Sequence, residues 1–261
     1  MTEFDKYAYY LQSVQSPDED VVFFEKTFRE LTGRKAVTMR EDFCAAAALS
    51  CAWAAYDPSH HSLGIDLDEE PIAYGRKNYL SKLGPEAQSR VKTFVRDVRA
   101  RPQPEADLVV VCNFSFFCFK ERAVLVDYLK GVYDSIKAPG MVLLDAFGGP
   151  ACTEPNENET EHDEFSYFWD QDTFNPITHE AMYYIHFKLQ GEEKRRERVF
   201  SYDWRMWSIP EIRDILAEVG FRKTVVYWEG SDEEGEGNGE FMPTEVGDDC
   251  ESWLAYIVGL K

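Results

Sequence analysis

Short apolar runs alternate with longer amphipathic stretches along most of this chain, and that alternation is typical of repeated βα units. The run at 107–112 is apolar throughout, as expected for a central parallel strand buried on both faces. Only an acidic, glycine-rich segment separates the last two runs, which predict a closing antiparallel hairpin. The pattern predicts strands at 36–40, 62–66, 91–95, 107–112, 142–146, 223–228 and 253–258, and helices at 45–55, 69–82, 121–136 and 210–219.

A further helix is predicted ahead of the first strand. Ser16 is expected to cap it, with Pro17 in its first turn and Glu19 closing a capping box. Gly220 is expected to stop the helix at 210–219. The N-terminal helix carries one apolar face, formed by Val21, Phe24, Phe28 and Leu31.

The alternation breaks between residues 147 and 207, where 183–187 and 198–202 predict two antiparallel strands. The sequence therefore predicts an α/β fold: a doubly wound, Rossmann-like, seven-stranded, mostly parallel sheet with an antiparallel last strand and an inserted antiparallel hairpin region. Its expected parts are an N-terminal cap segment and helix (1–35), a Rossmann-like core (36–146), an inserted substrate or lid region (147–207) and the C-terminal part of the core sheet (208–261).

Charge is distributed unevenly along the 261 residues. The net charge of −20 comes from 48 acidic and 28 basic residues. Segment 154–172 holds eight of the acids and segment 229–251 holds ten, and neither contains Lys or Arg. Both segments are expected to be solvated loops. This acidity argues against nucleic acid as a partner, because phosphate binding depends on basic patches.

The six cysteines form no Cys-x-x-Cys pair and lie mostly in apolar runs, which indicates buried thiols in a reducing compartment. The first ten residues lack the pattern of a signal peptide, and no apolar run approaches the length of a membrane span. We therefore expect a cytoplasmic protein that does not bind a membrane. No metal site is expected, because the crowded acids at 232–236 do not match the calcium-loop pattern.

The segment from Glu41 to Ala47 reads as a strand end, a tight turn of small residues and a helix start, and the next strand ends on Asp66. That order is the layout of a nucleoside-binding βαβ unit. A dinucleotide needs glycine N–H groups that face a pyrophosphate. Glu41 would instead repel phosphate and attract an ammonium group, and Asp97 is suited to accept from an adenine amino group. Both residues favour a cationic amino-acid nucleoside over NAD.

This segment resembles the first motif of class I S-adenosylmethionine-dependent methyltransferases, an acid followed by three alternating glycines. Glu41 matches the acid, and Phe43, Ala45 and Ala47 stand in the glycine positions. The resemblance implies that the core, 36–146, binds S-adenosylmethionine as cofactor. It assigns the ribose hydroxyls to Asp66, the adenine face to Leu67, the adenine amino group to Asp97 and Val98, and a place beside the reacting methyl to Asn113.

Arg40 and Asn113 each have more than one candidate role. Arg40 is either a bidentate partner for the methionine carboxylate or a structural arginine at the strand end. Asn113 is followed by Phe114 and Ser115, not by the prolines of the motif that binds a target nitrogen in enzymes methylating DNA or protein amides. Asn113 is therefore expected to hold the cofactor or an outer part of the substrate.

The substrate would be closed in by the N-terminal segment and the insertion. Segments 39–44, 169–172, 202–205 and 228–230 together resemble a bacterial subgroup of methyltransferases whose substrate is unassigned. Aromatic side chains with polar tips suit a pocket that shields a sulfonium. The candidate catalytic residues are Tyr10, Asn113, Trp169, Asp170 and Arg205, and the further pocket candidates are Tyr167, Gln171, His179, His186, Trp204 and Trp207.

Simpler structural roles stay open for part of this set. Trp204 and Trp207 could pack the hairpin on the sheet, and His179 and His186 could serve the fold alone. No general base is identified by the sequence. The glycine spacing at 237–239 allows the acidic segment to act as a substrate lid with Glu229.

Two functions of different classes fit these observations. The first is a methyltransferase that moves the methyl of S-adenosylmethionine to a nitrogen or oxygen of a small molecule. The second is a catalytically inactive protein on the same fold that binds S-adenosylmethionine or a basic protein partner. An oligomer is compatible with either. Retention of Glu41, Asp66 and Asp97 favours the enzyme, and NAD-dependent oxidoreduction ranks below both.

Overall fold

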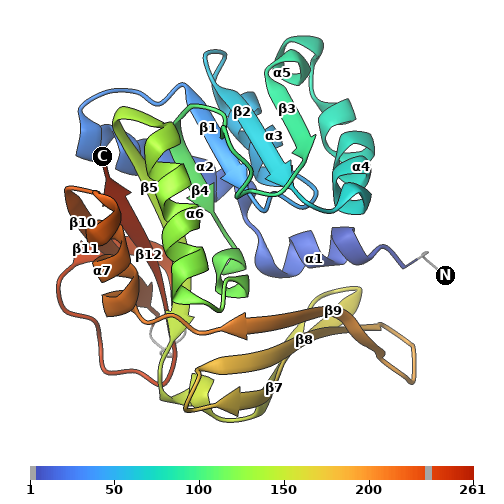
Figure 1. The fold of residues 1–261 in the computed structure, drawn as a ribbon. Helices are drawn as coiled ribbons and strands as arrows, with labels where there is room; N and C mark the ends of the chain where they lie inside the picture. Colours follow the sequence, from blue (N-terminus) through green and yellow to red (C-terminus); the bar gives the residue numbers. More distant parts are fainter. Residues whose placement is uncertain (1–3, 233–236) are drawn as a thin grey trace.

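The computed structural model describes residues 4–232 and 237–261, which form two sheets (Figure 1). The larger sheet has eight strands in the order β11-β10-β12-β5-β4-β1-β2-β3, and the smaller has four in the order β6-β7-β8-β9. The strands are β1 (Thr38–Asp42), β2 (His61–Asp66), β3 (Val91–Val95), β4 (Ala106–Val111), β5 (Ile136–Gly148), β6 (Asn156–Glu161), β7 (Phe165–Asn175), β8 (Glu180–Leu189), β9 (Arg196–Arg205), β10 (Lys223–Ser231), β11 (Gly237–Thr244) and β12 (Trp253–Leu260).

Helices cover both faces of the larger sheet. They are α1 (Lys6–Val14), α2 (Pro17–Thr32), α3 (Ala48–Tyr56), α4 (Glu69–Asn78), α5 (Pro85–Ser89), α6 (Arg122–Ser135) and α7 (Ile209–Val219), with short 3₁₀ turns η1 (Leu80–Lys82), η2 (Ser115–Cys118) and η3 (Pro150–Thr153). No helix of the described part is long and apolar enough to cross a membrane.

Strand β4 shows why the sheet must be covered twice. All six of its residues are buried. Leu108 and Val110 belong to the cluster packed against α2 and α3, whereas Val109 and Val111 belong to the cluster packed against α6 and α7. Successive side chains of a strand point to opposite faces, so an uninterrupted apolar run needs helices on both sides. The doubly wound arrangement predicted from the sequence is confirmed.

The predicted antiparallel last strand is also confirmed, because β12 pairs antiparallel with both β5 and β10. One further strand, β11, extends the edge beyond β10, so the sheet has eight strands where seven were expected. Phe241 anchors β11, with its ring centroid 4.6 Å from that of Tyr256 and 5.5 Å from that of Phe23. The acids around it hid this strand in the sequence pattern.

The acidic segment 154–172 is not a loop, contrary to expectation: it forms β6 and most of β7. Phe165, Tyr167 and Trp169 alternate along β7 and turn one face toward α1 and the core. Every residue of β6 is exposed, and its glutamates lie along a free sheet edge. Charge at such an edge opposes pairing with another chain. The acidic residues of this segment therefore lie on strands and do not mark a loop.

Three local expectations are corrected. Ser16 makes no side-chain cap at α2, and its carbonyl accepts from the Glu19 N–H, so no capping box forms there. A capping box does form at α7, between Ser208 and Glu211. Cys118 is exposed although buried thiols were expected.

Arg40 and Asp42, both fully buried on β1, form the most deeply buried ion pair of the described residues. Arg40 Nε and Nη2 donate to the two Asp42 oxygens at 2.9 and 3.0 Å, and the remaining donors reach the carbonyl of Pro104, Ser135 Oγ and Gln103 Oε1. Tyr128 Oη donates to Asp42 Oδ2 at 2.8 Å. Each of the five guanidinium N–H groups thus has an acceptor. A buried pair of this kind is tolerated because its polar atoms are satisfied.

We expect Arg40→Met to lower the free energy of unfolding by about 3–5 kcal/mol, because it leaves the Asp42 carboxylate buried without its partner. Urea unfolding followed by tryptophan fluorescence measures this. Arg122→Met is the matched control, since Arg122 and Glu218 form an ion pair in which both side chains are about half exposed; almost no change is expected there. Equal losses in the two variants would contradict the role given to the buried pair.

Candidate functional site

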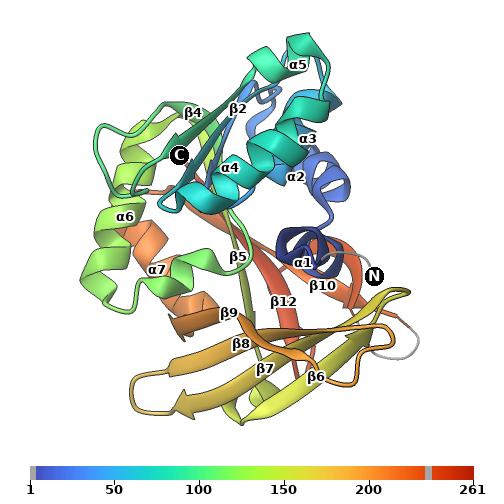
Figure 2. The same cartoon turned by 90° about the vertical axis from the view of Figure 1, so that its right-hand side faces the viewer.

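The candidate site lies at the carboxyl ends of β4, β1, β2 and β3, which are neighbours in the sheet. Strand order reverses between β1 and β4, and crevices at such reversals are where open α/β sheets bind ligands. These ends face α1 and the four-stranded sheet, which lies beyond them (Figures 1 and 2). The insertion and the N-terminal segment lie over these strand ends (Figures 1 and 2), and the region between them, which includes the cavity beside Asn113, is called the cleft.

The turn after β1 has the conformation that glycines would favour, although it contains none. Phe43, Ala45 and Ala47 have φ of 62°, 43° and 56°, in the left-handed region. These are the three positions that match the motif glycines. Left-handed backbone costs a residue with a Cβ about 1 kcal/mol or more. The surrounding contacts must therefore hold the turn.

Three contacts do so. The Ala45 N–H donates to Asp66 Oδ2 at 2.8 Å, which ties the turn to the end of β2. The Phe43 ring packs against Phe119, with centroids 5.6 Å apart, and against Tyr128. On α4, Gly75 lies so close to the turn that a Cβ there would collide with the carbonyl of Ala46. The ring contacts place Phe43 against the core.

Glu41, the motif acid, is buried on β1 just before the turn. Its Oε2 accepts from the backbone N–H of Ser50 at 2.9 Å and from Ser50 Oγ at 2.5 Å. Burial raises the pKa of Glu41 to about 8, against the effect of these two hydrogen bonds. The acid thus links β1 to the first turn of α3 and holds a proton readily at neutral pH.

Asp66 and Leu67 lie at the end of β2 in positions that suit a nucleoside. Asp66 Oδ1 accepts from the Asp68 N–H at 2.9 Å, and Oδ2 accepts from Ala45. Leu67 is 71% exposed beside this carboxylate. A large apolar side chain left in solvent at a strand end is available to cover a planar ligand.

Asp97 follows β3, the neighbour of β2. The Arg99 guanidinium donates to both of its oxygens, at 2.7–3.2 Å, and holds the pKa of Asp97 below its usual range. Asp97 therefore stays ionised as an acceptor but shares its oxygens with Arg99. The Val98 side chain is buried in the core cluster, so it is not free to contact a ligand.

The alternative role of Arg40 as a ligand for the methionine carboxylate is wrong for this structure. Its side chain is fully buried and its donors are engaged by Asp42 and the groups around it. A guanidinium without free donors cannot bind a second carboxylate.

Asn113 lies in a second strained turn, after β4. Asn113 and Phe114 have φ of 56° and 57°. Their N–H groups donate to Asp145, at 2.5 Å to Oδ2 and 2.8 Å to Oδ1. Asp145 is buried on β5, and burial raises its pKa to about 7. Asp145 could not be recognised from the sequence, because it lies inside an apolar strand and meets this turn only through the pairing of β4 with β5.

Tyr10 of α1 and Tyr202 of β9 are both partly buried in the cluster where α1 packs on the smaller sheet, and each lies close enough to affect the pKa of the other. Burial raises the pKa of Tyr10 to about 12. The Trp169 ring packs 5.1 Å from Tyr183 and 6.1 Å from Tyr202, on the same face of the smaller sheet. Tyr10 and Trp169 therefore stay candidates for substrate contact, and Tyr202 joins them.

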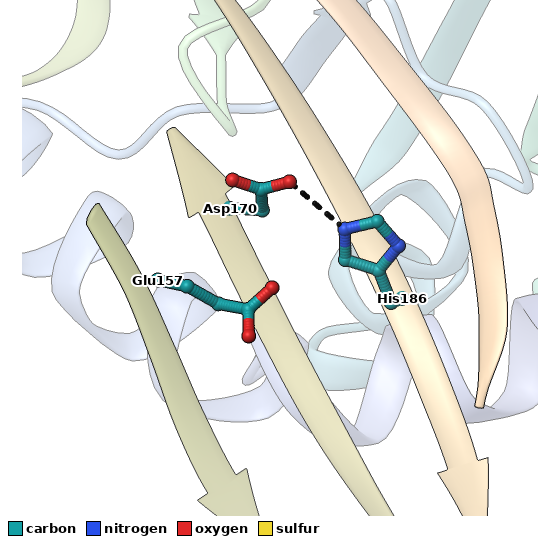
Figure 3. A group of neighbouring side chains, drawn as sticks. All are labelled: Glu157, Asp170 and His186. Atoms are coloured by element: carbon teal, nitrogen blue, oxygen red, sulfur yellow. Dashed lines mark hydrogen bonds and ion pairs between the residues drawn. The ribbon is translucent and has the colours of Figure 1, made fainter. Parts of the chain in front are cut away.

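Asp170 points the other way. It lies on the outer face of the smaller sheet with Glu157 and His186, and its Oδ2 is 3.1 Å from His186 Nε2 (Figure 3). These three side chains are close enough to hold a metal ion. Arg195 already pairs with Glu157 at 2.7 Å, and His186 Nδ1 accepts from the Arg198 N–H at 2.9 Å. Asp170 as a catalytic candidate is wrong, because it faces away from the cleft.

Arg205 is also excluded from the cleft by its contacts. Nη1 donates to the Lys120 carbonyl, Nη2 pairs with Glu211 at 3.2 Å, and the guanidinium lies 3.8 Å from the ring centre of Trp207. The proposed pocket roles of Trp204, Trp207 and Gln171 are likewise corrected. Trp207 Nε1 donates to the Phe119 carbonyl, Gln171 Nε2 donates to the carbonyls of Cys152 and Glu154, and Trp204 is buried in the core cluster.

His179 and His186 both lie away from the strand ends of the larger sheet. His179 is exposed in the turn between β7 and β8, with φ of 59°. His186 has the polar partners on the outer face that the sequence could not show. Neither reaches the cleft.

A cavity of about 310 Å³ opens beside Asn113. Its walls come from α2 and the connection before it, from the turn after β4, and from β5, β10, β11 and β12. Glu229 and Gly239, two residues of the predicted lid, line it. Asp20 and Tyr256 also line it and were missed, because helix and strand periodicity account for both.

No protein-family model matches the chain, and no curated protein matches it by sequence. Solved structures match over nearly the whole length. DesVI from Streptomyces venezuelae has a TM-score of 0.69 at 15% identity, with 98% of each chain covered. An S-adenosylmethionine-dependent methyltransferase from Clostridium acetobutylicum has a TM-score of 0.65 at 16% identity, with 97% of each chain covered.

A third match is CalS10 from Micromonospora echinaspora, an amino pentose methyltransferase solved with S-adenosylmethionine bound, with a TM-score of 0.65 at 14% identity and 98% of each chain covered. The chain therefore has the fold of the class I S-adenosylmethionine-dependent methyltransferases, as its first motif implied.

We expect Ala45→Gly to raise the free energy of unfolding by about 0.5–1 kcal/mol, because it removes the left-handed strain at a half-buried methyl. Ala46→Gly is the control: Ala46 lies outside the left-handed region, so glycine there only increases the freedom of the unfolded chain and should be neutral or destabilising. Urea unfolding compares the two. A loss at Ala45 as large as at Ala46 would mean that the turn is not strained.

Glu41→Gln should alter how stability depends on pH. The pKa of Glu41 is about 8 in the folded chain and near 4.5 in the unfolded chain, so its contribution is complete below about pH 4.5 and is lost as pH rises through 8. The variant lacks this loss. Its free energy of unfolding relative to the wild type should therefore increase by about 1 kcal/mol or more between pH 5 and 8. Urea unfolding of the variant and the wild type across this pH range measures it.

Proposed function

We propose that this chain is an S-adenosylmethionine-dependent methyltransferase that acts on a nitrogen or oxygen of a small molecule. One observation carries the proposal: the turn after β1 keeps the left-handed backbone at all three motif positions, with its N–H tied to the acid that ends β2. Because that backbone is costly for residues with a Cβ, its presence indicates a site that is used. The fold shared with the solved methyltransferases supports the same conclusion.

The residues present fit the cofactor. Asp66 offers carboxylate oxygens to ribose hydroxyls, exposed Leu67 offers an apolar face to adenine, and Asp97 stays ionised near the adenine edge. Glu41 lies behind the turn, where a ligand ammonium would favour its ionised form. The nucleoside would thus lie across the ends of β1, β2 and β3, with its reactive end toward Asn113.

When bound, S-adenosylmethionine supplies a methyl group activated by a sulfonium. The chain contributes position and exclusion of water, which are the main requirements of methyl transfer. The turn at Asn113 and Phe114, fixed by Asp145, sets the wall on one side. The side chains of Tyr10 and Tyr202, packed where α1 meets the insertion, would close the other side.

NAD is disfavoured by the same geometry. The turn that would have to approach a pyrophosphate carries the Cβ atoms of Phe43, Ala45 and Ala47. The neighbouring carboxylate of Asp66 would repel the phosphates.

Isothermal titration with S-adenosylmethionine, S-adenosylhomocysteine and NAD tests the proposal. We expect micromolar binding of the first two and none of the third. Asp66→Ala should weaken cofactor binding about 10- to 100-fold, because buried hydrogen bonds to the ribose are worth roughly 1–3 kcal/mol. Asp68→Ala is the control in the same loop, where the side chain caps α4, and should change affinity less than threefold. Silence toward both adenosyl ligands would refute the proposed function.

Turnover is a separate readout. Release of S-adenosylhomocysteine with a panel of small amines and alcohols would support the enzyme. Tight cofactor binding without any transfer would favour the inactive binding protein.

A further inference from the structure

We propose that the substrate is a cationic amine, held in the cavity beside Asn113 by the carboxylates of Asp20, Asp145 and Glu229. The inference rests on the proposed function, because it names the substrate class for that site.

The cavity is placed and sized for a small molecule. It lies at the carboxyl ends of β4 and β5, next to the turn at Asn113, and its volume of about 310 Å³ is in the range of small-ligand pockets. Its remaining walls come from parts of the chain far apart in sequence, α2 and β10 to β12. It is therefore a product of the assembled fold.

One wall is aromatic. The rings of Phe23, Phe241 and Tyr256 pack together, with centroids 4.6–5.5 Å apart. Aromatic faces attract cations through their ring electrons, and they also bind the apolar body of an organic ligand.

The charges that face this wall are all negative. Asp145 is 6% exposed and accepts from two backbone N–H groups. Asp20 accepts from Tyr256 Oη at 3.3 Å, and Glu229 accepts from the Gly239 N–H at 3.1 Å. Glu19 lies exposed at the rim. Among residues 4–232 and 237–261, no Lys, Arg or His forms an ion pair with these four acids, and no basic side chain lines the cavity.

The excess of acidic over basic side chains around the cavity affects the pKa values of its carboxyl groups. Burial raises the pKa of Asp20 to about 6 and that of Asp145 to about 7, and it raises the pKa of Glu229 as well. A cation in the cavity would supply the missing counter-charge and stabilise all three carboxylates.

Helix stabilisation accounts for only part of the arrangement. Asp18, Glu19 and Asp20 lie in the first turn of α2, where acids favour the helix dipole. Asp145 and Glu229 come from β5 and β10, so the helix does not explain them.

A metal ion fits less well than an organic cation. In the described part of the chain, the one group of three ligand side chains within reach of a single ion is Glu157, Asp170 and His186, on the outer face of the smaller sheet. The carboxylates of the cavity are spread around its wall. That spacing suits an ammonium group on a larger body.

Methyl transfer to such an amine requires that the nitrogen first lose a proton. The ammonium gives one proton to a cavity carboxylate, with Asp20 the candidate, and so exposes a lone pair on nitrogen. The lone pair forms a bond to the methyl carbon, the carbon–sulfur bond breaks, and its electron pair stays on sulfur. The products are an N-methylated ammonium and a neutral thioether, and the accepted proton passes to solvent.

The test uses the full chain saturated with S-adenosylhomocysteine and two isosteric pairs: benzylamine with benzyl alcohol, and methyl glucosaminide with methyl glucoside. Isothermal titration should show at least about tenfold tighter binding of the amine in one pair or both. Asp20→Asn should reduce that preference below about threefold, while S-adenosylhomocysteine affinity changes less than twofold. Asp18→Asn, in the same helical turn but outside the cavity, should keep the preference. Glu229→Gln, on β10 instead of α2, should also reduce the preference.

The inference is overturned if neither amine is preferred over its alcohol, or if Asp20→Asn weakens S-adenosylhomocysteine as much as the amine, since the carboxylates would then serve the cofactor. These results leave the proposed function intact when S-adenosylhomocysteine binds. Failure of that ligand to bind would instead reject the proposed function, and the amine preference would then be measured on the protein alone.

Discussion

The architecture of this site depends on a backbone conformation that its own side chains oppose. At the turn after β1, Phe43, Ala45 and Ala47 adopt left-handed φ values without the freedom of glycine. The cost is offset by contacts from three separate elements: Asp66 of β2, Gly75 of α4 and the aromatic rings beside Phe43. The strained turn persists because the fold around it determines it.

The same solution occurs at the next strand. Asn113 and Phe114, after β4, are also left-handed, and Asp145 of β5 binds both of their N–H groups. Asp66 and Asp145 thus have equivalent roles. Each is an acid on one strand whose carboxylate accepts from the backbone of the tight turn that follows the neighbouring strand. In both cases a carboxylate needed for shape lies where it can also act on a ligand.

Buried charges are paired inside β1 but unpaired along the cleft. Arg40 and Asp42 neutralise each other inside β1, and their polar atoms are satisfied. Along the cleft, burial raises the pKa of Glu41 and Asp145, and no ion pair from a described residue compensates it. An uncompensated acid costs stability, so its retention points to a ligand. The insertion follows the same division, with aromatic rings toward the cleft and the ionic group of His186 outside.

Periodicity and the motif order were sufficient to predict the doubly wound sheet, the antiparallel closing strand, the inserted hairpin and the strand ends that carry Glu41 and Asp66, because each depends on local spacing that a chain displays in its sequence. The sequence did not reveal β6, β7 and β11, since acids on their exposed faces masked the alternation. It also did not show that the donors of Arg40 are engaged by Asp42, or that Asp170 and Arg205 face away from the cleft. Nor did it show that Asp20 and Asp145 line the same cavity. Those outcomes depend on which side chains meet across strands far apart in sequence, and only the tertiary structure brings them together.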